Sequence, residues 1–241
     1  LSKRHGATAV REFREKGYLP EALMNYVSMV GWSYDGQREF FSKEELEQLF
    51  TLEKINKAPG IFDYKKLDWF NGQYIRQKGD EELLELLLPY MEKAGFVTLP
   101  LQEHEKRDML ALTAVSKERL KVLSDIVDLS RFLFETPSYE DVSLFTAKKV
   151  DLATATIALE RAYAKLKEGF DTGKGYEEIE AEIASLADEL DIKVNGVFMP
   201  LRVALTGSTV SLPLFDSIKL LGQAETYKRI ETALDVLKKE V

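Results

Sequence analysis

The spacing of apolar residues constrains the fold of this chain more than any other feature. Leu19, Leu23, Tyr26, Val27 and Val30 recur at intervals of three and four residues, which places them on one face of an α-helix. Similar spacing returns along the sequence, and no stretch shows the sustained alternation typical of a large sheet. The pattern therefore predicts an all-α fold, with short strands near residues 40–41 or 96–99 as the β alternatives.

Local signals indicate where the helices begin and end. Pro20 and Glu21 suit a first helical turn, because proline needs no hydrogen bond there and a carboxylate meets the positive helix end. Gly31 is suited to end that helix, and Ser42 with Glu45 has the spacing of a capping box. The predicted helices cover approximately residues 8–16, 20–31, 43–50, 63–78, 81–94, 103–122, 124–134, 142–168, 175–190, 196–206, 214–221 and 224–239.

Two breaks divide the predicted helices into larger regions. Between Gly95 and Pro100 a short apolar stretch lies between glycine and proline, which end one helical run before the next begins. We place a domain boundary there, between residues 1–94 and 95–241. Pro137 and Ser138 mark a weaker break, which makes a subdivision near residue 140 an option.

Composition excludes several classes of protein. The 241 residues are 45% hydrophobic and 31% charged, which is ordinary for a globular protein with room for two helical domains. No run approaches the roughly 20 apolar residues that cross a bilayer, so we expect a cytoplasmic protein that does not contact membranes. Without cysteine, and with only His5 and His104, the sequence predicts no bound metal.

The net charge of −8 conceals local variation. Nucleic-acid binding depends on lysine and arginine where the protein touches phosphates, and not on the overall charge. Residues 176–191 carry seven acids and no base, so we expect this helix to face away from any RNA. Basic residues outnumber acids in the middle of the first region, at Lys54, Lys57, Lys65, Lys66, Arg76 and Lys78.

The first residues combine small side chains with two cations. Ser2, Lys3 and Arg4, followed by His5 and Gly6, are of the type that holds triphosphate charge during phosphoryl chemistry. A solvated basic terminus is the simpler interpretation of these three residues alone. The blocks that follow favour the first interpretation.

Several blocks of sequence resemble bacterial glutamyl-tRNA synthetases, which are class I aminoacyl-tRNA ligases. In that family a Lys-Leu-Ser-Lys-Arg signature precedes a "G-[YF]-LPEALxNYLxxLGWS" helix and an "FSxEEL" helix start. This chain matches from the second residue of the signature onward, and the blocks occur in the family's order over nearly the whole chain. They are residues 1–4, 17–33, 41–46, 57–59, 62–63, 66–71, 74–75, 200–207, 214–216 and 220–222.

The resemblance implies a division of labour. Residues 1–94 are similar to the stem-contact region, with the truncated KMSKS-like lysine loop at its start, and residues 95–241 to the α-helical anticodon-binding domain. Ser2, Lys3 and Arg4 would contact ATP, which the intact enzyme uses with Mg²⁺. The family's ATP fold precedes the signature, so we expect this chain alone to bind no cofactor and to make no glutamyl-adenylate.

The same resemblance supplies candidate RNA contacts. Lys65, Lys66 and Arg76 would contact the tRNA stem, with Trp69 beside them, although a core position is the simpler interpretation of Trp69. Pro200 is expected to bend or loosen its helix. The anticodon contacts implied by the family are Arg202, Leu212, Leu214 and Phe215. Alternatively, Leu214 and Phe215 are core residues and Arg202 is a surface ion-pair partner.

Arg119 is a further candidate for anticodon binding. It stands upstream of residues 131–134 at the spacing of the family's discriminating arginine, which would read the third anticodon base. A solvated helix residue paired with a neighbouring acid is the alternative.

The sequence thus favours the tRNA-binding portion of a glutamyl-tRNA synthetase. Its expected partner is glutamate tRNA, with glutamine tRNA as a second candidate, and we expect a monomer that binds no DNA. The alternative is a helical protein-interaction module built on the same scaffold without an RNA function. A free-standing enzyme is less favoured, because no nucleophile–base pair or metal cluster is evident.

Overall fold

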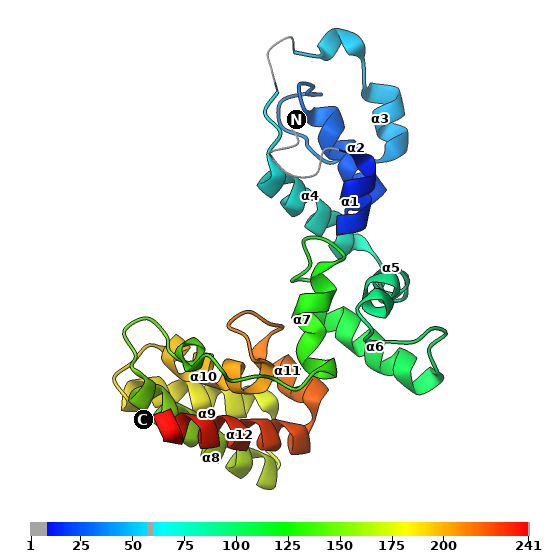
Figure 1. Ribbon diagram of the computed structural model, residues 1–241. Helices are drawn as coiled ribbons and strands as arrows, with labels where there is room; N and C mark the ends of the chain where they lie inside the picture. Colours follow the sequence, from blue (N-terminus) through cyan, green and yellow to red (C-terminus); the bar gives the residue numbers. More distant parts are fainter. Residues whose placement is uncertain (1–8, 57–59, 241) are drawn as a thin grey trace. The chain divides into compact units, whose positions relative to one another are not determined.

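The computed structural model describes residues 9–56 and 60–240, and these residues form α-helices joined by turns (Figure 1). An isolated antiparallel bridge joins Trp32 to Ile55, and no longer β-structure forms in the described ranges. The predicted all-α fold is confirmed, and residues 40–41 and 96–99 are not strands. The helices are α1 Val10–Lys16, α2 Pro20–Met29, α3 Lys43–Leu49, α4 Tyr64–Gln77, α5 Asp80–Lys93, α6 Glu103–Ser116, α7 Asp125–Phe134, α8 Leu152–Asp171, α9 Tyr176–Glu189, α10 Val194–Thr206, α11 Leu214–Leu221 and α12 Gln223–Glu240, with 3₁₀ turns η1 Leu52–Lys54 and η2 Val142–Phe145.

The chain forms two compact units, Leu1–Val127 and Asp128–Val241. The division falls within α7, whereas the boundary expected from sequence falls between α5 and α6. Packing and function need not divide a chain at the same residue, so the functional boundary at 94/95 stays a prediction. None of the helices in the described ranges is long and apolar enough to cross a membrane.

Two predicted helices are shorter than the sequence suggested. Residues 142–168 were expected to form one helix, but η2 ends at Phe145 and α8 begins at Leu152, where Asp151 accepts a hydrogen bond from the Thr154 amide. Lys149 between them has a positive φ, which a helix cannot accommodate. The other helix was expected to reach residue 122 but ends at Ser116. The backbone beyond it forms a turn in which the Lys121 and Val122 amides donate to the Asp125 carboxylate.

Two buried asparagines connect the elements of the first unit. Asn25 in α2 donates to the Glu39 carbonyl and accepts from the Phe41 amide, each at 2.7 Å. Asn71 in α4 accepts from the Leu19 amide at 2.8 Å and donates to the Lys121 carbonyl at 2.6 Å. Each side chain therefore satisfies one backbone donor and one acceptor that burial would otherwise leave unpaired.

An aromatic core fills the space between these elements. Phe13, Tyr26, Leu67 and Phe70 are buried together, and a smaller cluster gathers Trp32, Phe41 and Leu46 under α3. Tyr26 also fixes the start of α4, since its hydroxyl donates to the Asp63 carbonyl and accepts from the Asp63 amide. Trp32 and Phe70 are both buried in these clusters.

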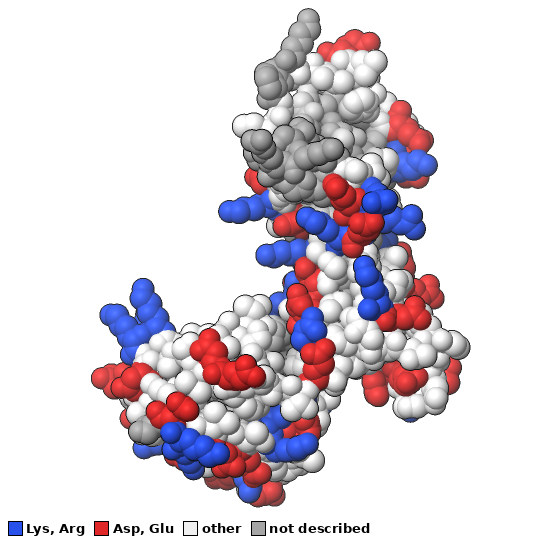
Figure 2. Space-filling view, in the orientation of Figure 1, with Lys and Arg blue, Asp and Glu red and all other residues white. Residues whose placement is uncertain are grey.

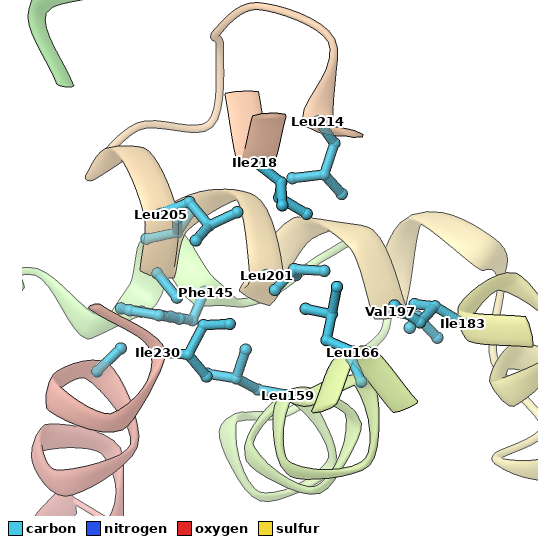
Figure 3. Close-up of a cluster of buried hydrophobic side chains, with 14 of the residues drawn as sticks. Phe145, Leu159, Leu166, Ile183, Val197, Leu201, Leu205, Leu214, Ile218 and Ile230 are labelled. Carbon is cyan, nitrogen blue, oxygen red and sulfur yellow. The ribbon is translucent and has the colours of Figure 1, made fainter. Parts of the chain in front are cut away.

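The second unit is built around α10. This helix packs against α8, α9 and α12, and its buried side chains Val197, Leu201 and Leu205 form the middle of the core. Figure 3 shows Leu201 facing Leu166 of α8, with Ile183 of α9 at one end of the cluster and Ile230 of α12 near the other. The core fixes α10 on several sides, which in turn fixes the loop that follows it.

The approach of Gly17 to a neighbouring turn generates a testable prediction. Gly17 has φ +85°, and a Cβ there would lie 2.7 Å from the Leu123 amide nitrogen. We expect Gly17→Ala to lower the free energy of unfolding by about 2 kcal/mol or more, because strain and a backbone clash combine. Urea unfolding followed by tryptophan fluorescence measures this unit alone, since Trp32 and Trp69 are the chain's two tryptophans.

Gly36→Ala is the matched control. Gly36 has φ +82° but nothing within 4 Å of an added Cβ, so its substitution carries only the conformational cost of about 1 kcal/mol. Equal losses for the two variants would contradict a role for the close approach at Leu123.

Candidate nucleic-acid interface

The predicted stem contacts lie on α4. Asp63 caps this helix by accepting from the Lys65 and Lys66 amides, so the two lysines occupy its first turn. Lys65 is exposed, and Arg76 lies eleven residues later, which is close to three whole turns. The two cations therefore share one face of α4, about 16 Å apart along its axis.

Acidic neighbours modulate this charge. Lys66 Nζ lies 2.5 Å from Glu39 Oε1, and Arg76 Nε lies 3.9 Å from Glu118 Oε2. The Lys66–Glu39 pair is partly exposed, whereas the Arg76 side chain is only 25% exposed beside an exposed Glu118, and partly exposed pairs of this kind contribute little to stability. Figure 2 shows basic and acidic side chains intermingled on the face in view, so the net charge of −8 is not gathered in one patch there.

Trp69 differs from the core position that its amphipathic spacing suggested. Its side chain is 47% exposed, although its ring contacts the edges of Phe40 and Phe70. Helical geometry places Trp69 within about 40° of Lys65 around α4. The face that carries the exposed cation thus also carries an exposed aromatic ring, a combination suited to contact with nucleic acid.

Arg119 lies in the turn after α6, not inside a helix. Its side chain is exposed and pairs with no acid among the described residues, whereas the adjacent Glu118 pairs with Arg76. Arg119 belongs to the first unit and Arg202 to the second. Its role in reading an anticodon base stays a prediction.

Arg202 holds the loop that follows α10. The helix runs through the buried Pro200 to Thr206, and Arg202 Nη1 donates to Ser211 Oγ at 2.5 Å and to the Leu212 carbonyl at 2.9 Å. These bonds close residues 207–213 back onto the helix. Gly207, with φ +68°, allows the chain to reverse there.

The other residues predicted to contact the anticodon are buried. Leu212 is fully buried, and Leu214 and Phe215 are each 6% exposed within the core of the second unit. Their packing agrees with the alternative interpretation as core residues, and a role in anticodon binding stays a prediction. Ser2, Lys3 and Arg4, expected to contact ATP, lie outside the described residues.

A pocket of about 490 Å³ opens beside the same loop. The sequence alone did not indicate it, because one wall comes from α7 and the other from the distant loop at the end of α10. Its lining is part apolar and part polar: Asp128, Leu129, Arg131, Phe132, Thr206, Gly207, Ser208, Val210 and Ser211.

The pocket combines a fixed cation with an exposed apolar tip. Arg131 donates to Asp128 at 3.0 Å and to Glu135 at 3.1 Å. The hydrogen bond to Asp128, with Glu135 nearby, raises the pKa of Arg131 above its ordinary value. Val210 is 69% exposed, and the Ser208 hydroxyl donates to its carbonyl, which shapes the loop tip. Because Arg131 is already paired with two carboxylates, the pocket suits a planar, polar ring better than an additional phosphate.

Two family models match the chain. The first, "Anticodon binding domain", matches residues 82–234, which include Arg119, Arg202 and the whole pocket. The second, "tRNA synthetases class I (E and Q), catalytic domain", matches residues 1–69. Together they define part of a class I aminoacyl-tRNA synthetase that includes an anticodon-binding domain.

Individual relatives narrow the class. A glutamate–tRNA ligase from Borrelia duttonii is 46% identical over 239 residues, which are 99% of this chain and 47% of the relative. One from Treponema denticola is 42% identical over 97% of this chain and 50% of its own length. A crystal structure of a glutamate tRNA ligase from Elizabethkingia meningosepticum, in complex with its amino acid, matches with a TM-score of 0.70 and 26% identity over 98% of this chain and 45% of its own.

The chain therefore belongs to the glutamate–tRNA ligase family, which confirms the resemblance seen in its sequence. It spans about half the length of the curated relatives it matches.

The Arg202 contacts predict how the loop behaves. Arg202→Ala removes both bonds to residues 211 and 212, and hydrogen bonds from charged groups contribute about 1.5–3 kcal/mol. We expect the amides of residues 207–212 to exchange with deuterium about tenfold faster, as measured by mass spectrometry of peptides.

Arg161→Ala provides the control for this change. Its pair with Glu189 joins two half-exposed side chains in the same unit and is expected to contribute little. Unchanged exchange of residues 207–212 in Arg202→Ala would show that the loop is held by other contacts.

Proposed function

We propose that this chain is the tRNA-binding part of a glutamate–tRNA ligase, in which residues 1–94 contact the tRNA stem and residues 95–241, with Arg119 and Arg202, contact the anticodon. The observation that carries the proposal is where the loop and the pocket lie along the chain. The Arg202-held loop and the adjacent pocket lie inside the stretch that the anticodon-binding model matches. Glutamate tRNA is the proposed partner, with glutamine tRNA as a second candidate.

The finer features follow from the family. The intact enzyme is proposed to use ATP with Mg²⁺, with Ser2, Lys3 and Arg4 near the phosphates. We propose a monomer in the cytoplasm, where translation consumes charged tRNA. The 241-residue chain tested alone is proposed to form no glutamyl-adenylate, because it spans only about half the length of its relatives.

A binding experiment tests the central proposal. The chain is titrated with glutamate tRNA at several salt concentrations, and we expect log affinity to fall linearly with log salt as phosphate contacts release counterions. Lys65→Ala should weaken binding to all tRNAs and reduce that slope by about one, because it removes one phosphate contact. Lys43→Ala, which removes an exposed lysine of α3 paired with Glu47, is the matched control.

Arg202→Ala separates base recognition from phosphate contact. We expect it to weaken binding of glutamate tRNA about tenfold at every salt concentration, because the loop no longer supports a base, while the slope is kept. No binding of the wild-type chain even at low salt would contradict the proposal and favour the protein-interaction module.

The proposed inactivity has its own measurement. We expect the chain, given glutamate, ATP, Mg²⁺ and tRNA, to exchange no pyrophosphate into ATP above background. Exchange above background would show that the 241 residues suffice for adenylate formation.

A further inference from the structure

Arg229 of α12 is the most enclosed cation of the second unit's described residues. It is 7% exposed, and its Nη1 donates to the Phe132 carbonyl at 2.8 Å and to the Leu205 carbonyl at 2.7 Å. Its Nε donates to Glu225 at 2.7 Å, which fixes the plane of the guanidinium. A buried charge is retained only with such complete pairing.

The two carbonyls belong to the last turns of two different helices. Phe132 lies near the end of α7, and Leu205 near the end of α10, where carbonyl groups have no partner within the helix. A cation at this position also suits the negative end of each helix. One side chain thus ties the C-termini of α7 and α10 together.

The same two turns form the walls of the pocket. Phe132 and Arg131 contribute to one wall, and Thr206 and Gly207 to the other. Arg229 does not line the pocket, so it acts from behind, through the backbone of the turns that do.

Resting on the proposed function, we propose that Arg229 is a positioning residue for anticodon recognition: it sets the separation of the two walls between which an RNA base is bound. Its contribution is to specificity, because a pocket wall displaced by a fraction of an ångström no longer fits a particular base. Phosphate attraction depends on charges elsewhere on the surface.

Tyr139 supports the same wall. Its hydroxyl donates to the Ala204 carbonyl at 2.6 Å, one residue before the carbonyl that Arg229 binds. Burial raises the pKa of Tyr139 to about 12, so the donor keeps its proton at all ordinary pH values. Arg229 and Tyr139 together satisfy two consecutive carbonyls at the end of α10. These hydrogen bonds restrain the backbone position of that last turn.

The test compares two RNAs on the full chain. A synthetic anticodon stem–loop of glutamate tRNA is titrated beside the same stem–loop with its three anticodon bases replaced, and the ratio of the two affinities is the preference. Arg229→Lys keeps the charge but loses the planar guanidinium that binds two carbonyls and Glu225 at once. For this variant we expect the preference to fall roughly tenfold, while the dependence of log affinity on log salt stays unchanged. Tyr139→Phe should lower the preference in the same direction by a smaller factor.

Ile183→Ala controls for stability. Ile183 is fully buried in the same core but near Val197, at the other end of the cluster from Leu205 (Figure 3). This variant should lower the unfolding temperature and keep the preference, with all titrations made well below each variant's unfolding transition.

The outcomes separate this inference from the proposed function. A wild-type chain with no preference between the stem–loops means that the proposed function has failed. A wild-type preference that persists in both Arg229→Lys and Tyr139→Phe overturns the positioning role alone. A preference lost equally in Ile183→Ala also overturns it, because general stability would then be the cause. If Arg229→Lys does not fold, the Tyr139→Phe result decides.

Discussion

The backbone groups at the helix ends need hydrogen-bond partners, and the side chains that supply them position the helices within each unit. Most of its helices are short, and each one leaves backbone groups without partners at both ends. In the second unit the C-terminal turns of α7 and α10 meet a buried guanidinium, Arg229, and α10 also meets the Tyr139 hydroxyl. The hydrophobic core holds these helices together, and the hydrogen bonds to their terminal carbonyls add a directional constraint that apolar contacts lack.

The first unit uses asparagine for the same purpose. Asn25 and Asn71 each bind one backbone amide and one carbonyl from segments distant in sequence, which joins α2 and α4 to loops without regular structure. Gly17 allows the turn at residues 123–124 to approach closely. As a result α4 keeps a fixed orientation within the first unit, with Lys65 and Trp69 one helical turn apart on its exposed face.

The parts of the fold that local chemistry determines could be predicted from sequence. Pro20 and Glu21 began α2, and Ser42 with Glu45 formed the capping box of α3, because these signals act within one turn. The break between η2 and α8 was missed, since apolar spacing continues across it and only the Asp151 cap and the backbone of Lys149 interrupt the helix. Trp69 was expected in the core because periodicity does not reveal which part of a helix face lies beyond the reach of neighbouring elements.

The candidate site was only partly predictable. Arg202 was identified from its motif, but its bonds to Ser211 and Leu212 depend on how the loop folds back. The pocket and the role of Arg229 join residues nearly a hundred positions apart, as the bond from Arg229 to Phe132 illustrates. Such contacts leave no periodic signal in a single sequence, whereas a motif carried by a family survives in the linear order of residues.

Anticodon contact by the second unit is the central claim, and nuclease footprinting of glutamate tRNA bound to the chain tests it most directly. The account predicts that the anticodon loop is protected in the complex and becomes accessible again when Arg202 is replaced by alanine. Protection of the acceptor end alone, with an anticodon loop that is cut as readily as in free tRNA, would contradict it.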